Sequence, residues 1–294
     1  MDPLEDVLAL AGASSYVSAG MTAGGRWAVR FEPPAGVKFN SVRRGTCQVH
    51  VDGTEPIVLR EDDAFLLTQP RGFTLASATG VPPVPAKLIF QEPAAHAGVG
   101  DEVEVIGGGF TFNERGRTLL LPNLPPILHV PGDAPEAATV RWVLQRIGAE
   151  LARGDVGATV VAEHLAMVMF VEVLRLHLRS GRTAGWLAGL ADPVVAATLR
   201  AMHTRPEHPW TVAELARTAR VSRSTLAGRF KDLVGTSPLD YLTGWRIELA
   251  AQRLTGTDDT LSTIARAVGY GSESALSTAF KRVTGRSPRD YRRQ

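Results

Sequence analysis

The feature that most constrains the fold is a stretch of twenty residues that occurs twice near the C-terminus. Residues 222–241 align without a gap with residues 272–291, and ten of the twenty aligned positions are identical. Repetition at a fixed offset indicates two copies of one structural unit. The chain therefore carries a duplicated module, and each copy must be able to form its own small core.

Each copy predicts a helix with defined ends. Ser222 and Ser272 are suited to cap the helix start, because their hydroxyls can accept an orphan backbone N–H. Apolar residues follow at helical spacing in both copies. Gly235 and Gly285 fit the left-handed residue that ends a helix, and Pro238 then opens the next helix.

A shorter predicted helix precedes each copy, over residues 212–219 and 261–268. Two helices joined by a tight turn, the second with a polar face, form a helix-turn-helix motif. In this motif the second helix enters the DNA major groove. We expect two such units, at 211–234 and 260–284, joined by one helix over 239–254.

At these residues the chain resembles the AraC/XylS family of bacterial transcription regulators. The resemblance implies a DNA-binding domain over 190–294, double-stranded promoter DNA and RNA polymerase as partners, and a homodimer. It leaves open whether the protein is an activator, as its family suggests, or a repressor. Its signature in this sequence is Ile264-Ala265, Val268-Gly269-Tyr270, Ser274, Leu276, Phe280-Lys281, Gly285, Ser287-Pro288 and Tyr291-Arg292.

The net charge of +2 hides an uneven distribution. From residue 192 onward there are 16 Arg and Lys but 10 Asp and Glu, which leaves 16 basic and 20 acidic residues for the rest. A basic module joined to an acidic body suits a polyanionic partner for that module alone.

The sequence has neither a second cysteine nor a long apolar stretch, and this limits the class of protein. With Cys47 as the single cysteine, no internal disulfide is possible, and a cytoplasmic location is expected. No stretch reaches eighteen consecutive apolar residues, so no membrane partner is expected.

The first part of the chain predicts a β-sandwich or barrel after a short helix over 4–10. Short apolar runs are separated by Gly and Pro at about ten-residue spacing, which is typical of such folds. Asp52-Gly53 predicts a hairpin turn, and Gly107-Gly108-Gly109 is interpreted as a turn after a strand. The expected strands are 27–31, 39–42, 46–51, 57–59, 64–67, 73–75, 87–90 and 102–106.

The order of turns from Arg44-Gly45 to Pro70-Arg71-Gly72 resembles the cupin-like sensor domain found ahead of AraC-type modules. The expected fold class is therefore multidomain α+β. It comprises a cupin-like jelly-roll β-barrel over 1–134, helices over 135–185, and an all-α C-terminal domain. A small-molecule effector is expected at the N-terminal domain.

Two amphipathic or apolar helices are predicted between these domains, over 136–153 and 158–179. The second is apolar on more than one side, which fits either burial in the core or burial against a second subunit. The family resemblance favours a dimer. Residues 180–185 are interpreted as a linker.

The predicted DNA contacts follow from exposed positions near the start of each second helix. Arg223 could pair with guanine, and Glu273 could accept from cytosine. Relatives often carry Arg at positions equivalent to Gly228, Thr278 and Gly244, so this chain departs from the family there. The candidate base contacts are Arg223, Ser224, Thr225, Ala227, Gly228, Glu273, Ser274, Ser277 and Thr278. The candidate phosphate contacts are Thr211, Ser222, Arg229, Lys231, Arg246, Ser272, Lys281 and Arg282.

Two alternative functions remain open at this point, a cupin-type metal enzyme and a thiol-based redox sensor. The seven histidines are scattered, with no His-x-His pair, and Cys47 on a strand fits a small core residue. We therefore expect no enzyme, no cofactor and no metal. The candidate ligand-lining residues are Trp27, Phe31, Phe39, Phe65 and Phe73.

Overall fold

The computed structural model describes residues 2–91, 95–181 and 185–293. Its contacts divide the chain into two compact units. The sheet unit contains Ala13–Asn113 and Leu124–Ser180. The helical unit contains Met1–Gly12, Glu114–Asn123 and Gly181–Gln294. Three of the six residues of the predicted linker, 182–184, lie outside the described residues.

The sheet unit consists of two facing sheets with a shared apolar core. One sheet has the strand order β11-β6-β3-β10-β1-β9, and the other has the order β5-β4-β7-β2-β8. The first contains β1 (Ser14–Gly24), β3 (Val37–Arg44), β6 (Ala64–Leu67), β9 (His96–Gly98), β10 (Val103–Thr111) and β11 (Ile127–Val130). The second contains β2 (Ala28–Phe31), β4 (Cys47–Val51), β5 (Ile57–Leu59), β7 (Phe73–Ala76) and β8 (Val84–Pro85).

The fold class is confirmed, with a sheet-rich N-terminal domain and a helical C-terminal domain. The described strands form two sheets rather than a closed barrel. Each sheet contains one parallel pair, β1 with β9 and β2 with β8, and its other pairs are antiparallel. Gly53 has a φ of +78° in the turn between the antiparallel strands β4 and β5, as the predicted hairpin requires.

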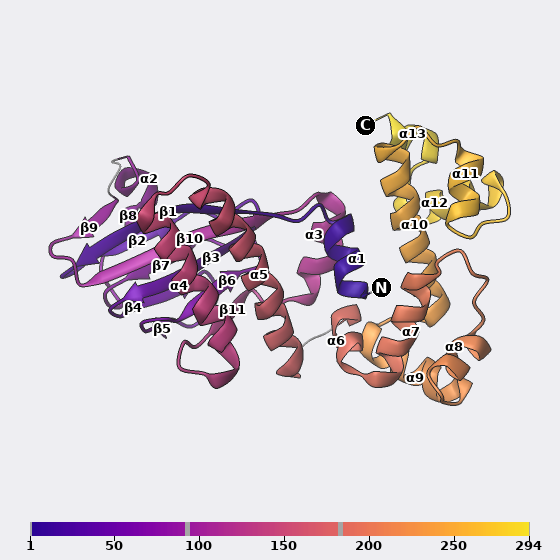
Figure 1. Ribbon diagram of the computed structural model, residues 1–294, viewed down its shortest axis with the longest axis horizontal. Helices are drawn as coiled ribbons and strands as arrows, with labels where there is room; N and C mark the ends of the chain where they lie inside the picture. The colour runs from indigo at the N-terminus through magenta and orange to yellow at the C-terminus, as the bar shows by residue number, and fades with distance from the viewer. Residues whose placement is uncertain (1, 92–94, 182–184, 294) are drawn as a thin grey trace. The chain divides into compact units, whose positions relative to one another are not determined.

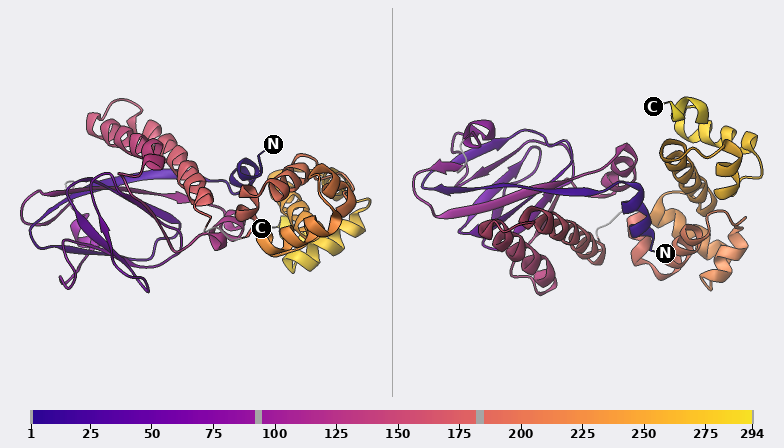
Figure 2. Two further views of the ribbon diagram at one scale, coloured as in Figure 1. Left: turned by 90° about the horizontal axis from the view of Figure 1, so that it is seen from below. Right: turned by 45° about the horizontal axis from the view of Figure 1, so that its top comes forward.

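Helices α4 (Ala138–Arg153) and α5 (Ala158–Arg179) cover the outer face of the six-stranded sheet, as Figure 2 shows. The α4 stripe of Val140, Val143 and Ile147 is buried, as its spacing predicts. On α5, the Phe170 ring lies 4.6 Å from the Phe110 ring of β10, between ring centroids. The two predicted helices are therefore confirmed, and at least one side of α5 is buried within the unit.

The predicted turn at Gly107–Gly109 is wrong, because all three glycines lie inside β10. A Cβ on Gly108 would lie 2.4 Å from Phe39 Cε1, and one on Gly109 would lie 2.6 Å from the Tyr16 hydroxyl. The aromatic rings of neighbouring strands thus occupy the places that side chains would take on opposite faces. Glycine is required here for close packing, which is a recognised use of glycine within a strand.

The predicted strand at 87–90 is also wrong, because α2 (Ala86–Ile89) forms there instead. A short apolar run does not distinguish a strand from one helical turn. Phe90 at its end lies edge-on to Phe31, with ring centroids 6.2 Å apart.

The helical unit is organised around α10 (Pro238–Gly256), which contributes to two separate apolar cores. Leu242 joins the core of the first helix-turn-helix group, whereas Ile247, Ala250 and Leu254 join that of the second. Figure 1 shows the two groups at opposite ends of α10. The other helices are α1 (Pro3–Leu10), α3 (Glu114–Leu120), α6 (Gly185–Ala191), α7 (Pro193–Thr204), α8 (Val212–Thr218), α9 (Arg223–Val234), α11 (Leu261–Ala267), α12 (Glu273–Thr284) and α13 (Pro288–Arg292).

Segments 1–12 and 114–123, which we expected in the sensor domain, pack by their contacts on helices of the helical unit. They form α1 and α3, and the sequence analysis did not predict α3. In the part of the chain that the structure describes, no helix is long and apolar enough to cross a bilayer.

Candidate nucleic-acid interface

The predicted second helices of both helix-turn-helix units are present as α9 and α12, with the predicted ends. Ser222 Oγ accepts a hydrogen bond from the Thr225 backbone N–H at 3.1 Å, and Ser272 Oγ accepts one from Ala275 at 3.2 Å. Gly235 and Gly285 end the helices with φ of +85° and +76°. The twin helices therefore follow directly from local sequence signals.

The preceding helices α8 and α11 are positioned by buried small residues. Thr211 and Glu214 form the predicted reciprocal capping box at the start of α8. Ala216 and Ala265 are 2% and 1% exposed, where each short helix packs against its longer partner. Arg220 takes a positive φ of +56° in the first turn, and Gly269 takes +83° in the second.

The candidate base-contacting residues occupy the N-terminal halves of α9 and α12, opposite buried Leu226, Phe230, Leu276 and Phe280. All of them are exposed except Ser277, which is half-buried. A helix that presents polar residues at its start and buries its other face has the arrangement that enters a major groove. Their contacts with bases remain a prediction.

Most of the candidate phosphate-contacting residues are exposed, namely Thr211, Ser222, Arg229, Lys231, Ser272, Lys281 and Arg282. The Arg229 guanidinium lies 3.4 Å from the Asp192 carboxylate, at the start of α7. An exposed pair of this kind contributes little stability, so the guanidinium remains available to an anion.

Arg246 differs from the other candidate phosphate contacts, because its guanidinium is engaged inside the helical unit, and its contact with phosphate remains a prediction. It donates hydrogen bonds to the backbone carbonyls of Pro206 at 2.6 Å and His208 at 2.8 Å. It also lies 5.9 Å from the centroid of the Tyr270 ring. These hydrogen bonds attach the 205–211 loop to α10.

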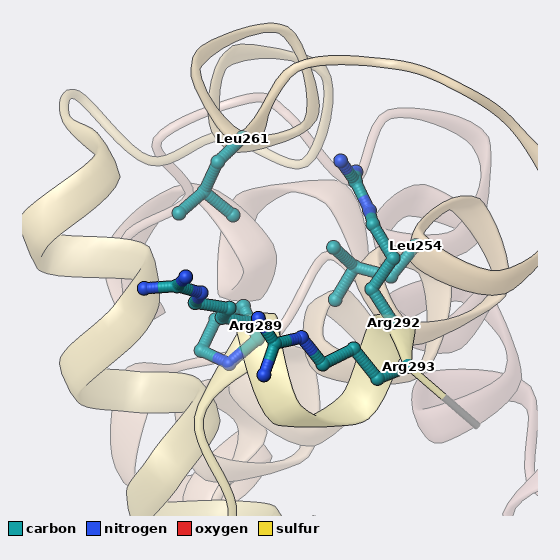
Figure 3. A pocket seen from close by; sticks show the side chains of 6 residues that line it. Leu254, Leu261, Arg289, Arg292 and Arg293 are labelled. Atoms are coloured by element: carbon teal, nitrogen blue, oxygen red, sulfur yellow. The ribbon is translucent and has the colours of Figure 1, made fainter.

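A set of cations on α13 and at its C-terminal cap was missed by the sequence analysis. Arg289, Arg292 and Arg293 surround a hollow of about 210 Å³ with Leu254, Leu261 and Pro288 on its wall, as Figure 3 shows. The Arg292 guanidinium donates to the backbone carbonyl of Asp259. The concentration of arginines over 286–293 was the available sequence signal.

Two contact sets tie α1 and α3 to helices α7, α10 and α13 of the same unit. Asp6 lies 3.2 Å from His203 Nδ1, and His203 Nε2 lies 2.8 Å from the Tyr241 hydroxyl. Burial lowers the pKa of His203 to about 3, so the ring is neutral at pH 7. A neutral ring that accepts from Tyr241 at Nε2 donates from Nδ1 to Asp6.

The second set joins α3 to the second helix-turn-helix group. The Arg115 guanidinium donates to the Tyr291 hydroxyl at 3.1 and 3.2 Å and lies 3.8 Å from the Glu248 carboxylate. The side chains of Arg115 and Glu248 are 13% and 22% exposed. Burial raises the pKa of Glu248, and the charge of Arg115 opposes that rise. No local sequence pattern indicated these pairs, because the partners lie far apart in the chain.

Gly228 provides a direct test of the interface. It is exposed on α9, and a Cβ there would meet no atom within 4 Å. Gly228→Arg is expected to strengthen binding to nonspecific duplex DNA. It is also expected to steepen the slope of the logarithm of the binding constant against the logarithm of salt concentration by about one, the value for one added phosphate contact. The measurement is a salt titration of binding by fluorescence anisotropy.

Gly256→Arg is the matched control, because Gly256 has equally open surroundings outside the predicted interface. An unchanged salt slope for Gly228→Arg would show that this face of α9 does not meet DNA.

The candidate ligand-lining residues of the sheet unit are mostly packed against each other. Trp27, Phe65 and Phe73 lie in the core between the sheets, with Phe31 stacked on Phe73 at 4.6 Å between ring centroids. Phe39 lies on the other face of its sheet, against Phe110. Whether any of them contacts a ligand remains a prediction.

Two further observations concern the alternative functions. Cys47 is 1% exposed, and burial raises the pKa of its thiol to about 12. Among the residues that the structure describes, no group of three or more His, Cys, Asp or Glu is placed to hold a metal ion.

Comparison with known proteins places both units. The sequence matches a family model described as Cupin over residues 2–179 and one described as Helix-turn-helix domain over residues 215–294. It is 58% identical to an AraC-like transcription regulator of Streptomyces lividans, across 100% of this chain and 98% of the relative. It is 56% identical to one of Streptomyces antibioticus, across 100% and 99%.

Among solved structures, the DNA-binding domain of the global transcriptional factor AdpA in complex with a target DNA is 32% identical. The match covers 35% of this chain and 91% of that one, with a TM-score of 0.33.

Proposed function

The chain belongs to the AraC-like transcription regulators, and from this premise we propose that it binds promoter DNA through α9 and α12 under the control of a small molecule. The observation that carries the DNA-binding role is the pair of exposed polar helix starts, each supported by its own core on α10. The roles proposed for the segments are sensing for 1–134, dimerisation for 135–185 and DNA binding for 190–294.

The test of this function is footprinting of the full-length protein on the DNA upstream of its own gene. Two helices on one connecting helix are expected to protect two neighbouring major-groove segments on one face of the duplex. Protection of a single segment, or equal protection of unrelated DNA at the same salt concentration, would contradict the proposal.

Control by a small molecule is supported by the way the strands continue into the helical unit. Strand β1 follows α1, and α3 follows β10. Ser14 of β1 pairs with Thr111 of β10, and their hydroxyls are 2.7 Å apart. A change in this strand pair would therefore act on α1 and α3 together. A ligand shifts such an equilibrium only by its differential affinity for the two arrangements.

Arg115 tests this coupling. Arg115→Met leaves the Glu248 carboxylate without its cation and removes the hydrogen bonds to Tyr291. The contact between α3 and the second helix-turn-helix group is expected to weaken by about 1–3 kcal/mol, the cost of leaving a buried polar group unpaired. Hydrogen exchange of the α13 backbone amides is expected to accelerate accordingly.

Arg117→Met is the control, because Arg117 is exposed on the same helix. A double-mutant cycle with Glu248→Gln isolates the pair. Equal hydrogen-exchange rates of the α13 amides in both arginine variants, or fully additive effects in the cycle, would contradict the proposed coupling between α3 and the second helix-turn-helix group.

A homodimer through α5 is the proposed assembly. Val161 and Val168 on α5 are 42% and 46% exposed, with half-buried Leu165 between them in the same stripe. Apolar side chains at helical spacing on an exposed face favour burial against a second helix. Sedimentation velocity measures the association state.

We further propose RNA polymerase as a macromolecular partner, the cytoplasm as location, and no catalytic activity. The relatives are transcription regulators, which supports this assignment. The thiol-sensor alternative is disfavoured, because a buried thiol with a raised pKa forms little of the reactive thiolate.

A further inference from the structure

The inner face of the six-stranded sheet changes from apolar to polar along its strands. Residues directly opposite each other in neighbouring strands point to the same face. Three such rows cross β1, β10 and β3. They are Met21–Val105–Val42, then Ser18–Gly107–Asn40, then Tyr16–Gly109–Lys38.

The first row belongs to the core between the sheets. The other two continue along the same face, because Asn40 and Lys38 pair with the core residues Phe65 and Leu67 of β6. The side chains of Tyr16, Ser18, Lys38 and Asn40, which we call the polar cluster, therefore lie on the inner face of the sheet. This is the face on which an amphipathic sheet normally places apolar residues.

Lys38 lacks a counter-charge in this cluster. Its ammonium donates a hydrogen bond to Ser18 Oγ at 3.2 Å and lies 5.8 Å from the centroid of the Tyr16 ring. Burial alone lowers the pKa of the ammonium to about 8, with no contribution from an acidic group. At pH 7 the group is still a cation, and this half-buried cation has no anion within the cluster to offset its lost hydration.

Asn40 adds an unpaired donor. It is 5% exposed, and its Nδ2 is buried without a hydrogen-bond partner. A buried unpaired amide of this kind costs about 1–3 kcal/mol unless a further group satisfies it. An amide in this position is retained at a cost to stability, which is a pattern found at binding sites.

The glycines of β10 bring these side chains together. A Cβ on Gly107 would lie 2.8 Å from Asn40 Oδ1 and 3.4 Å from Ser18 Oγ. The two side chains thus face each other across the bare backbone of Gly107, and the hydrogen bond with Lys38 ties Ser18 to the next row. The cluster thus holds an ammonium, a hydroxyl and an amide, of which the Asn40 oxygen is the atom nearest Gly107 and Nδ2 is the atom without a partner.

We propose that the polar cluster is a binding site for a carboxylate, held by Lys38, Asn40 and Ser18. A carboxylate offers oxygens that accept from several donors at once and supplies the negative charge that Lys38 lacks. The inference names the chemical class of the effector, and in that respect it rests on the sensor role proposed above. The ligand would join β1 to β3, and β1 begins at Ser14, shortly after α1 ends at Leu10.

The test uses the full-length protein and direct binding, without DNA. The probes are the sodium salts of acetate, butyrate, octanoate and benzoate, with the corresponding neutral amides and with sodium chloride at equal ionic strength. Calorimetry and thermal unfolding are expected to show binding and stabilisation by at least one carboxylate, with no effect of its amide. Absence of any carboxylate effect beyond that of chloride would overturn the proposal.

Two variants assign the binding to the cluster. Lys38→Met is expected to weaken carboxylate binding roughly tenfold or more and, because it removes a half-buried cation without a counter-charge, to raise the unfolding temperature of the free protein. Asn40→Asp supplies an internal counter-charge, so it is expected to stabilise the free protein and to prevent carboxylate binding. Lys87→Met, at an exposed lysine of α2, is the control. Unchanged carboxylate affinity in both cluster variants would overturn the proposal.

The experiments distinguish failure of the carboxylate site from failure of the proposed sensor role. Carboxylate binding that depends on Lys38 but leaves the DNA footprint unchanged would support this site and contradict the sensor role. A footprint that responds to other compounds, in a protein that binds no carboxylate, would contradict this site and support the sensor role.

Discussion

Phe280→Ala is expected to destabilise the second helix-turn-helix group by about 3–5 kcal/mol, the usual cost of truncating a buried phenylalanine. Phe280 is 0% exposed and packs edge-on against Tyr291, with ring centroids 5.3 Å apart. A loss of this size is a large fraction of the free energy of unfolding of a small domain. Urea unfolding measures the change, and footprinting measures its consequence for DNA binding.

The footprint is expected to lose only the segment contacted by α12. The cores of the two helix-turn-helix groups have no residue in common, so the group around Phe230 and α9 keeps its packing. Val283→Ala is the control on the same helix, because Val283 is 46% exposed. A complete footprint with Phe280→Ala, or equal destabilisation by the two substitutions, would contradict independent cores.

Arg223→Ala is expected to reduce affinity for the specific site by about 1–3 kcal/mol, which is roughly 5- to 150-fold, and to relax the preference at one base pair. The reason is that an exposed arginine at the start of α9 can donate two hydrogen bonds to one guanine. Binding to a set of duplexes, each altered at one base pair, measures both effects.

Lys281→Ala provides the contrast, because Lys281 lies in the last turn of α12, away from the helix start. Loss of a phosphate contact weakens binding about equally for all sequences and reduces the salt slope by about one. Arg223→Ala with an unchanged base preference would show that α9 does not read this base pair.

The sequence determined the helical module because its signals are local. The caps at Ser222 and Ser272, the left-handed glycines at 235 and 285 and the apolar spacing between them act within a few residues. The duplication then showed which of these signals belong together. The helix boundaries and the polar faces of α9 and α12 could be predicted for that reason.

Tertiary structure decided the features that depend on residues distant in the chain. Gly107–Gly109 has the composition of a turn, but the rings of Tyr16 and Phe39 make it the centre of a strand. The charge and position of Arg246 in the sequence predict a phosphate contact. In the structure its guanidinium donates hydrogen bonds to the backbone carbonyls of Pro206 and His208.

Residues distant in the chain also provide the partners of the side chains on which the proposed control by a ligand depends. Arg115 meets Tyr291 across 176 positions of sequence, and Asp6 meets His203 across 197. Lys38 and Asn40 are separated by a single residue, but only strand pairing places them beside Ser18 on an inner face. Local propensity encodes helices and turns, whereas the partner of a buried charge depends on how the whole chain packs.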